Sequence, residues 1–280
     1  MKKHSTINSV VYHSFVIAFG FVMIYPIIWM IASSLKPEAE IFQNAASLIP
    51  SVLRWENYAT GWEGFGRVGF EVFFTNSLLI TGMVVIGSLF SSSLVAFAFA
   101  RLNFKFKKSL FACLLATVML PMQVTLIPQY IIFYNLGWVN TFYPLIVPAF
   151  IGGIPFFIFL MIQFIRGIPK ELDEAAVIDG CTTYGIFWRI ILPLTKPALV
   201  TVAIFSFMWS WDDFFSALIY LNSPELYTVA LALANFLDSS DATAWGPLLA
   251  MSSLSLLPQF LLFMFFQKYL VQGVATTGLK

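Results

Sequence analysis

Four of the fourteen carboxylates in this 280-residue sequence fall within the ten residues ELDEAAVIDG, from Glu171 to Gly180. Clustered carboxylates can serve acid–base or metal chemistry, but the chain offers no companions for either. Its histidines, His4 and His13, lie near the N-terminus, and its cysteines, Cys113 and Cys181, belong to no Cys-x-x-Cys or Cys/His spacing. Neither Gly-x-Ser-x-Gly nor His-Glu-x-x-His occurs. We therefore expect no enzyme and no resident metal.

A second candidate group lies in the segment WSWDDFF. Asp212 and Asp213 are the only carboxylates within an apolar stretch long enough to span a membrane. Charge is costly in lipid, so ionisable groups at such positions predict a function. Trp209 and Trp211 flank the pair, and aromatic faces beside carboxylates suit a sugar. Alternatively, both carboxylates lie in the outer third of the span, where water solvates them and they only support the structure.

Two glutamines form a third candidate group. Gln123 and Gln129 lie close to Pro121 and Pro128, and prolines in a membrane helix release backbone carbonyl groups. Broken helices often mark substrate paths, although membrane helices also tolerate proline for packing. We treat both glutamines as candidates for the substrate pathway.

The composition indicates that these groups are carried by membrane helices. Apolar residues make up 59% of the chain and charged residues only 10%, against about a quarter charged in soluble proteins. The sequence predicts one all-helical integral membrane domain, residues 1–280. A turn at NLGWVN divides an uncharged run of 57 residues. The six predicted spans are 11–34, with a kink at Pro26, then 73–99, 109–133, 142–165, 198–221 and 245–267.

The distribution of lysine and arginine predicts the orientation. With the N- and C-termini in the cytoplasm, twelve of the fifteen cationic residues lie inside, in agreement with the positive-inside rule. The three that lie outside are Lys36, Arg54 and Arg67. This orientation places the loop 166–197, with its acidic cluster, in the cytoplasm between the fourth and fifth spans.

The cytoplasmic loop has local signals of its own. Pro169 followed by acidic residues predicts a helix start. Ala176, Gly180 and Thr183 have the spacing of one helix face, so either another backbone approaches this stripe or the chain bends at the glycine. Two prolines in IILPLTKP, residues 190–197, are expected to stiffen the connection to the fifth span.

The whole pattern resembles the EAA loop of binding-protein-dependent ABC importer permeases. The similarity extends along most of the chain and is greatest for carbohydrate permeases of the MalG type, as in NSLLIT, AFAFARLNFKFKK and WSWDDFFSALIYL. Asp212 departs from the asparagine expected there, and the tail VQGVATTGLK lacks the usual Ala-Val-Lys ending. The resemblance implies ATPase-coupling roles for Glu174, Ala175, Ala176, Asp179, Gly180, Ile190, Leu192 and Pro193.

The resemblance also implies an architecture and a set of partners. The expected fold is the type I ABC importer permease fold, in a multi-pass protein of the bacterial inner membrane. A homologous permease, two ATPase subunits carrying ATP and magnesium, and an extracytoplasmic binding protein that contacts the loop 222–244 would complete an importer for a sugar or oligosaccharide. The chain has no Gly-x-x-x-x-Gly-Lys motif, so it binds no ATP through a P-loop. The alternative is a secondary transporter or channel that uses Asp212 and Asp213.

Overall fold

A computed structural model describes residues 4–236 and 244–275 of the chain. Within these ranges the regular secondary structure is helical and contains no strand, apart from an isolated bridge between Phe65 and Val68. The prediction of an all-helical fold is therefore confirmed for the described residues.

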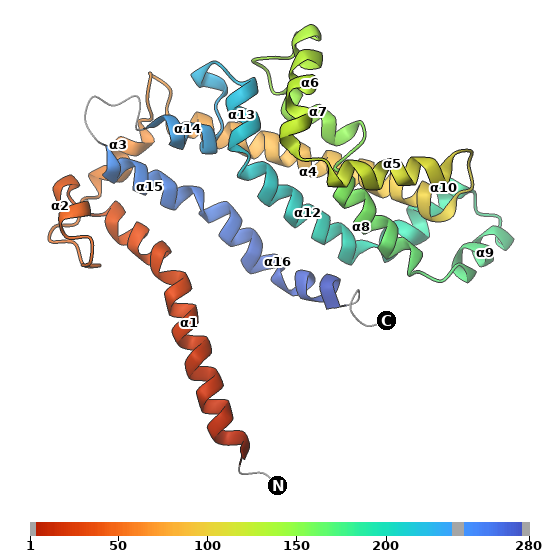
Figure 1. Cartoon of the computed structure of the whole chain (residues 1–280), viewed down its shortest axis with the longest axis horizontal. Coiled ribbons are helices and arrows are strands. Elements are labelled where there is room, and N and C mark those ends of the chain that lie inside the picture. Colours follow the sequence, from red (N-terminus) through yellow and green to blue (C-terminus); the bar gives the residue numbers. More distant parts are fainter. Residues whose placement is uncertain (1–3, 237–243, 276–280) are drawn as a thin grey trace. The chain divides into compact units, whose positions relative to one another are not determined.

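The chain divides into two compact units. The first comprises Met1–Glu71 and Leu233–Leu257, and the second comprises Val72–Ala232 and Pro258–Lys280. Helices that lie wholly in the first unit are α1 (His4–Ser34), α2 (Glu38–Gln43), α3 (Glu56–Trp62) and α15 (Trp245–Ser255). Helix α15 packs against α1 and α3, and it also contacts α2 (Figure 1). The packing of α15 thus joins the two sequence segments of this unit.

Polar side chains hold the first unit together. Glu38 accepts hydrogen bonds from the backbone N–H groups of Trp245 (2.9 Å) and Gly246 (3.0 Å), so its carboxylate satisfies the N-terminus of α15. The Lys36 side chain is fully buried, and its Nζ donates to the carbonyl oxygens of Asn44 (3.1 Å) and Ser47 (2.6 Å). A buried ammonium requires such partners. The predicted outer loop after the first span is therefore an ordered structure.

The second unit contains the remaining helices. They are most of α4 (Phe70–Arg101), α5 (Lys107–Met119), α6 (Met122–Asn135), α7 (Tyr143–Phe150), α8 (Pro155–Arg166), α9 (Glu171–Ile178), α10 (Thr183–Ile186), the π-helix η1 (Phe187–Ile191), α11 (Leu192–Leu194), α12 (Lys196–Trp211), α13 (Phe214–Tyr220), the 3₁₀ helix η2 (Pro224–Leu226), the first half of α14 (Val229–Phe236) and most of α16 (Leu257–Ala275). Its main core joins Phe97 of α4, Met161 and Ile165 of α8, Phe187 of η1 and Val202 of α12. Three predicted spans and the cytoplasmic loop therefore share one core.

Within residues 4–236 and 244–275, four helical segments are long and apolar enough to cross a membrane, and counting each of two bent helix pairs as one span raises the number to six. The four segments are Ser9–Ser34, which continues through Pro26, Phe70–Arg101, Tyr143–Arg166 and Trp245–Gln267. They overlap the predicted first, second, fourth and sixth spans. The crossing of a membrane by each of the six stretches stays a prediction.

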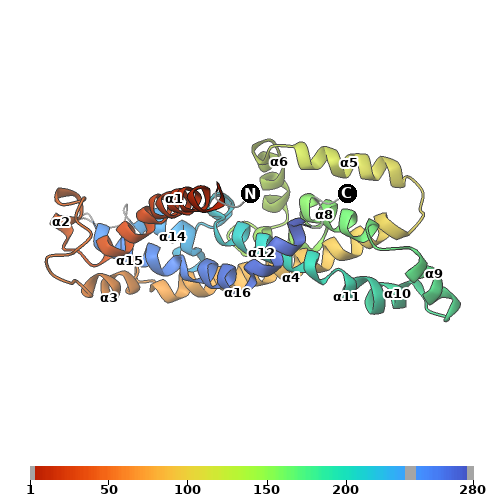
Figure 2. The same cartoon turned by 90° about the horizontal axis from the view of Figure 1, so that it is seen from below.

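The predicted third and fifth spans are not straight helices. The helical segments 107–119 and 123–135 meet at 106°. Figure 2 shows that α5 and α6 run in different directions. Pro121 explains the break, because it lacks an N–H donor and holds the preceding Leu120 in an extended conformation. In the fifth stretch, α12 ends at Trp211, before Asp212 and Asp213, and α13 begins after them.

Candidate functional site

Helix α9 begins close to the predicted helix start. Its first residue, Glu171, follows Pro169 by two positions, and its first turn also holds Asp173 and Glu174. These carboxylates lie near the positive end of the helix dipole. Of the eight residues of α9, only Asp173 and Ala176 are not exposed. The helix therefore presents most of its surface to the outside of this chain.

Gly180 ends α9 with a turn. Its φ of +79° lies in the left-handed region, its N–H donates to the carbonyl of Val177 (3.0 Å), and the N–H of Cys181 donates to the carbonyl of Ala176 (2.9 Å). This pair of bonds is the Schellman motif, in which glycine is favoured. Ala176, Gly180 and Thr183 therefore do not form one helical stripe, and the alternative of a bend is confirmed. A Cβ at Gly180 would meet nothing within 4 Å in this chain, so its backbone conformation explains the glycine.

A second helical segment follows the turn. Thr182 caps α10, because its side chain accepts a hydrogen bond from the N–H of Gly185 (3.3 Å). Further along, the N–H of Leu192 donates to the carbonyl of Phe187, a five-residue step that makes η1 a π-helix. Pro193 follows directly, and its missing N–H favours such an irregular turn. The segment 183–194 then meets 196–211 at 74°.

The surface of α9, α10 and η1 combines charge with uncovered apolar side chains. Ile178 is 86% exposed, and Val177, Tyr184 and Trp188 are exposed beside it. A shallow concavity of about 520 Å³ lies next to them, lined by Asp179, Gly180, Cys181, Thr182, Tyr184, Gly185, Trp188 and Arg189. Such a surface is typical of a protein contact rather than of a solvated loop. We call these exposed residues, Val177, Ile178, Tyr184 and Trp188, the loop surface.

A smaller, partly open cavity lies in another part of the second unit. It has a volume of about 200 Å³ and opens between α4, α7, the break before α8, and α12. Its polar or aromatic lining residues are Ser206, Trp209, Ser210, Asp213 and Thr228. The Trp209 ring stacks on Phe157 with centroids 5.0 Å apart and ring planes inclined by 18°. An aromatic face surrounded by hydroxyl groups and one carboxylate is chemically suited to a saccharide.

A glycine in the wall of this cavity lies where the predicted fourth span breaks. Gly153 has a φ of +64°, and a Cβ there would lie 2.5 Å from Ser91 Oγ. Ser91 Oγ donates to the carbonyl of Ala149 (2.7 Å), which satisfies a backbone group released at the end of α7. The break is therefore compensated by a side chain of α4, as expected for irregular backbone at membrane depth.

Comparison with known proteins identifies the family. A family profile described as "Binding-protein-dependent transport system inner membrane component" matches residues 88–276. The chain belongs to this family. As such a permease it is a membrane subunit rather than an enzyme. Its resemblance to ABC importer permeases is thereby confirmed, and so is its multi-pass location in the inner membrane.

Individual relatives agree with this assignment. The permease is 38% identical over 256 residues to the "Probable ABC transporter permease protein YurM" of Bacillus subtilis (91% of this chain, 83% of the relative). It is 35% identical over 263 residues to the arabinooligosaccharides transport system permease protein AraQ of Halalkalibacterium halodurans (93% and 92%). It is also 31% identical over 265 residues to the trehalose/maltose transport system permease protein MalG of Thermococcus litoralis (94% and 94%).

A solved structure confirms the fold. A chain of a bacterial ABC transporter involved in the import of the acidic polysaccharide alginate superposes with a TM-score of 0.81. The match covers 96% of the permease and 98% of that chain, at 21% identity. A second structure, an alginate ABC transporter in complex with a periplasmic protein bound to an alginate pentasaccharide, gives a TM-score of 0.67 at 14% identity, with 94% and 93% covered. The ABC importer permease fold predicted from the sequence is therefore observed.

Within the permease, the candidate pathway residues separate into two groups. Trp209, which is 46% exposed, and Asp213 line the cavity. Trp211 is 4% exposed because it packs between Phe74 and Phe207, at centroid distances of 5.4 and 5.7 Å. Gln123, Gln129 and Asp212 are exposed and are not among the residues that line the cavity. Only Trp209 and Asp213 of the six candidates thus come together there.

Asp213 has a structural task as well. Its Oδ1 accepts a hydrogen bond from the N–H of Ser216 (3.0 Å), so it caps α13 while it lines the cavity. The sequence reasoning missed Ser206, Ser210, Thr228 and Gly153. Serine and threonine are common packing residues of membrane helices, so their types alone carried no signal for the cavity.

The residues implied in ATPase coupling also differ in exposure. Glu174, Ala175, Asp179, Gly180 and Pro193 are exposed. Ala176 is buried, and Ile190 and Leu192 are partly buried against the main core. The implied set therefore combines an outward face, available to a partner, with residues that attach this face to the permease. Of the cysteines, Cys113 is exposed and Cys181 is partly buried, and both are free thiols.

Proposed function

We propose that this permease forms one half of the membrane channel of an ATP-driven importer for a sugar or oligosaccharide. A homologous permease supplies the other half, two ATPase subunits carry ATP and magnesium, and an extracytoplasmic binding protein delivers the substrate. The N- and C-termini lie in the cytoplasm. The names of relatives, which include transport systems for arabinooligosaccharides and for trehalose or maltose, support a saccharide substrate.

The loop surface is the observation that carries the proposed ATPase contact. Ile178 is almost fully exposed, although an isolated membrane subunit has no reason to present large apolar side chains to the cytoplasm. The acidic first turn of α9 lies beside it, so a partner with an apolar groove and cationic or N–H donors would complement both features. The excess of lysine and arginine in the predicted inner loops supports a cytoplasmic position for this surface.

Substitution of Ile178 tests this contact. The Ile178→Asp variant places a charge in the proposed apolar interface, and we expect at least tenfold less ATPase subunit to copurify with the permease pair. Ile178→Leu is the matched control, because it keeps an apolar side chain of the same size. A complex of Ile178→Asp that retains its full complement of ATPase subunits and its uptake rate would contradict the contact.

The cavity supports an uncharged saccharide as substrate. Among the described residues of this permease that line it, Asp213 is charged and no lysine or arginine is present. A carboxylate accepts hydrogen bonds from sugar hydroxyl groups but repels a uronate. We therefore expect ATP hydrolysis by the reconstituted complex to be stimulated by binding protein loaded with a neutral oligosaccharide. Stronger stimulation by a uronic acid oligomer would contradict this substrate class.

The energy source separates this function from secondary transport. Uptake into vesicles should stop when internal ATP is removed and should continue when an ionophore collapses the membrane potential. Proton or cation coupling through Asp212 and Asp213 requires the reverse result.

The loop 222–244 is the proposed contact for the binding protein. Its apolar segment folds back against the permease, since Val229, Leu231 and Ala232 are buried. Residues 237–243 lie outside the described ranges. Cross-linking from Asn235, which is partly buried, or from its exposed neighbour Ala234 should capture the binding protein loaded with substrate. Failure at both positions while uptake continues would contradict the contact.

A further inference from the structure

Helix α9 is attached to the rest of the permease by few side chains. Six of its eight residues are exposed, and the other two, Asp173 and Ala176, lie three positions apart on one face. Ala176 contributes a single methyl group to the main core. Asp173 is therefore the polar attachment of α9 on its inner face.

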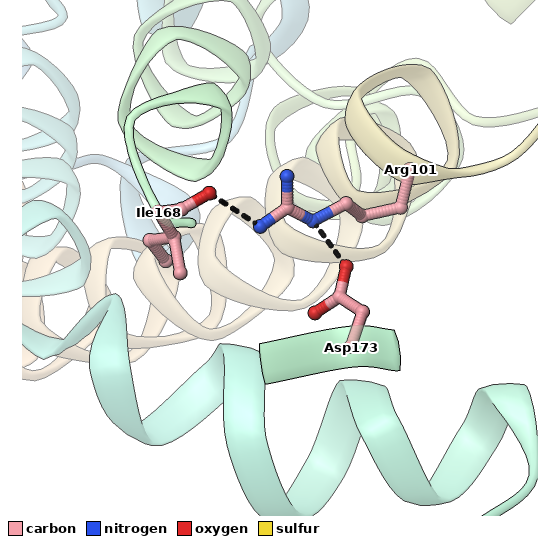
Figure 3. Close-up of polar contacts among 3 residues, drawn as sticks. All are labelled: Arg101, Ile168 and Asp173. Atoms are coloured by element: carbon pink, nitrogen blue, oxygen red, sulfur yellow. Dashed lines mark hydrogen bonds and ion pairs between the residues drawn. The ribbon is translucent and has the colours of Figure 1, made fainter. Parts of the chain in front are cut away.

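The partner of Asp173 is the last residue of the long helix α4. Arg101 Nε lies 2.7 Å from Asp173 Oδ2, and Arg101 Nη2 donates to the carbonyl oxygen of Ile168 at 2.8 Å (Figure 3). One guanidinium thus holds both the first turn of α9 and the chain just before it. Because the guanidinium is rigid and planar, its hydrogen bond to Ile168 and its ion pair with Asp173 move together.

The ion pair is buried and only partly satisfied. The side chains of Arg101 and Asp173 are 5% and 18% exposed. Among the described residues, Arg101 Nη1 and Asp173 Oδ1 are buried without a hydrogen bond, and the contact of the buried Arg101 Nε with Asp173 is an ion pair without hydrogen-bond alignment. Burial of a charged pair often contributes little net stability, because the desolvation cost offsets the attraction. The pair therefore adds little net stability, whereas it does tie the first turn of α9 to the end of α4.

The two helix ends also complement each other electrostatically. Arg101 lies at the C-terminus of α4 and Asp173 in the first turn of α9. Each charge therefore faces the favourable end of its own helix dipole. The two helices meet at the end of the second unit where α4 leads into α5 (Figure 2). A displacement of α9 therefore acts on α4, a helix long enough to span a membrane, through this polar contact.

We infer that the Arg101–Asp173 ion pair is the positioning link through which movement of α9 reaches α4. Ala176 keeps α9 close to the core, and the ion pair transmits its rotation or displacement. This role rests on the proposed contact between the loop surface and the ATPase subunits. Both residues are positioning residues that touch neither substrate nor nucleotide.

The test measures the movement of α4 in the complete complex, reconstituted in lipid with both permeases and the ATPase subunits. A single cysteine replaces the exposed Leu79 or Ile86 of α4, with Cys113 and Cys181 changed to serine. The probe is N-ethylmaleimide, whose labelling rate is measured without nucleotide and after trapping with ATP and vanadate. We expect the two rates to differ at least threefold in the parent complex. Equal rates at both positions would overturn the inference, because α4 would not respond to the ATPase.

Asp173→Asn should bring the ratio of these rates close to one while the ATPase subunits stay bound and continue to hydrolyse ATP. Glu171→Gln is the matched control, since it removes an exposed carboxylate from the same helical turn, and it should keep the parent ratio. If the ratio of labelling rates in Asp173→Asn equals that of the parent complex, the inference is overturned.

Two further variants keep the outcome decisive. If Asp173→Asn does not assemble, Arg101→Lys replaces it, because lysine keeps the charge but lacks the rigid planar fork that holds Asp173 and Ile168 in fixed directions. If the Arg101→Lys complex assembles and its two labelling rates differ as much as in the parent complex, the inference is overturned. Ile178→Asp tests the proposed function alone. If it leaves the ATPase subunits bound, the contact is wrong, whereas loss of the ATPase in Ile178→Asp with a parent ratio in Asp173→Asn contradicts only the link.

Discussion

Helix α9 and the break between α12 and α13 both place a carboxylate at the start of a helix, but with different neighbours. Asp173 meets the guanidinium of Arg101, whereas Asp213 is held by the backbone N–H of Ser216 and lines a cavity with Trp209. In the apolar segment, a backbone donor satisfies the carboxylate without bringing a second charge into the membrane region. In the loop, an ion pair fixes one helix to another. We thus propose recognition for the aspartate of one region and positioning for the aspartate of the other.

Substitution of Trp211 by alanine should have the largest effect on assembly of the complex. Trp211→Ala removes a ring packed between Phe74 and Phe207, and such a deletion costs about 3–5 kcal/mol of folding free energy. We expect little assembled complex and a lower midpoint of thermal unfolding. Trp209→Ala is the comparison, because Trp209 is half exposed and lines the cavity. It should leave assembly near normal and reduce uptake, so equal loss of assembly in both variants would contradict the assignment of Trp209 to the cavity.

Gly180 tests the loop region. Gly180→Leu forces a branched side chain into a left-handed conformation, at a cost of about 1–2 kcal/mol, and places it in the concavity of the loop surface. We expect transport to fall tenfold or more. Gly180→Asn should lose less, because asparagine tolerates this conformation. Gly185→Ala is a control without positive φ. Wild-type ATPase retention and stimulated hydrolysis in Gly180→Leu would contradict a coupling role for this turn.

Two substitutions of Asp213 distinguish its role as a helix cap from the role of its charge. Asp213→Ala removes the cap of α13 and should lower stability by about 1 kcal/mol, measured by thermal unfolding of the assembled complex. Asp213→Asn keeps a good cap, so its effect should appear in uptake and not in stability. Asp212→Asn changes an exposed side chain and should alter neither. Normal uptake in the Asp212→Asn, Asp213→Asn double variant would remove both residues from the pathway.

Glu174 should give the smallest effect. It is exposed in the first turn of α9, where its interaction with the helix dipole contributes about 0.3–1 kcal/mol. Glu174→Ala should therefore leave the permease folded and reduce ATPase retention less than Gly180→Leu does. Retention is measured by copurification at low and high salt, since a charged contact weakens with ionic strength. A larger loss than in Gly180→Leu would reverse the relative importance of charge and turn geometry.

Much of the loop was predictable because its signals are local. Pro169 and the acidic residues after it predicted the start of α9, and Gly180 predicted a bend as one of two alternatives. The bond pattern of the Schellman motif then decided between them. The sequence did not predict that Arg101 would meet Asp173, because their proximity depends on how α4, α8 and α9 pack.

The sequence by itself determined the helical architecture, the apolar stretches and the family, because composition, charge distribution and short motifs depend on residues close together in the chain. Tertiary structure decided which side chains meet. Trp209 and Trp211 are two positions apart, about 200° around a helix, so packing alone placed one at the cavity and the other in the core. The cavity hydroxyl groups of Ser206 and Thr228 and the Arg101–Asp173 pair likewise come from separate elements. Their contacts follow from the burial of several helices together, which no local pattern specifies.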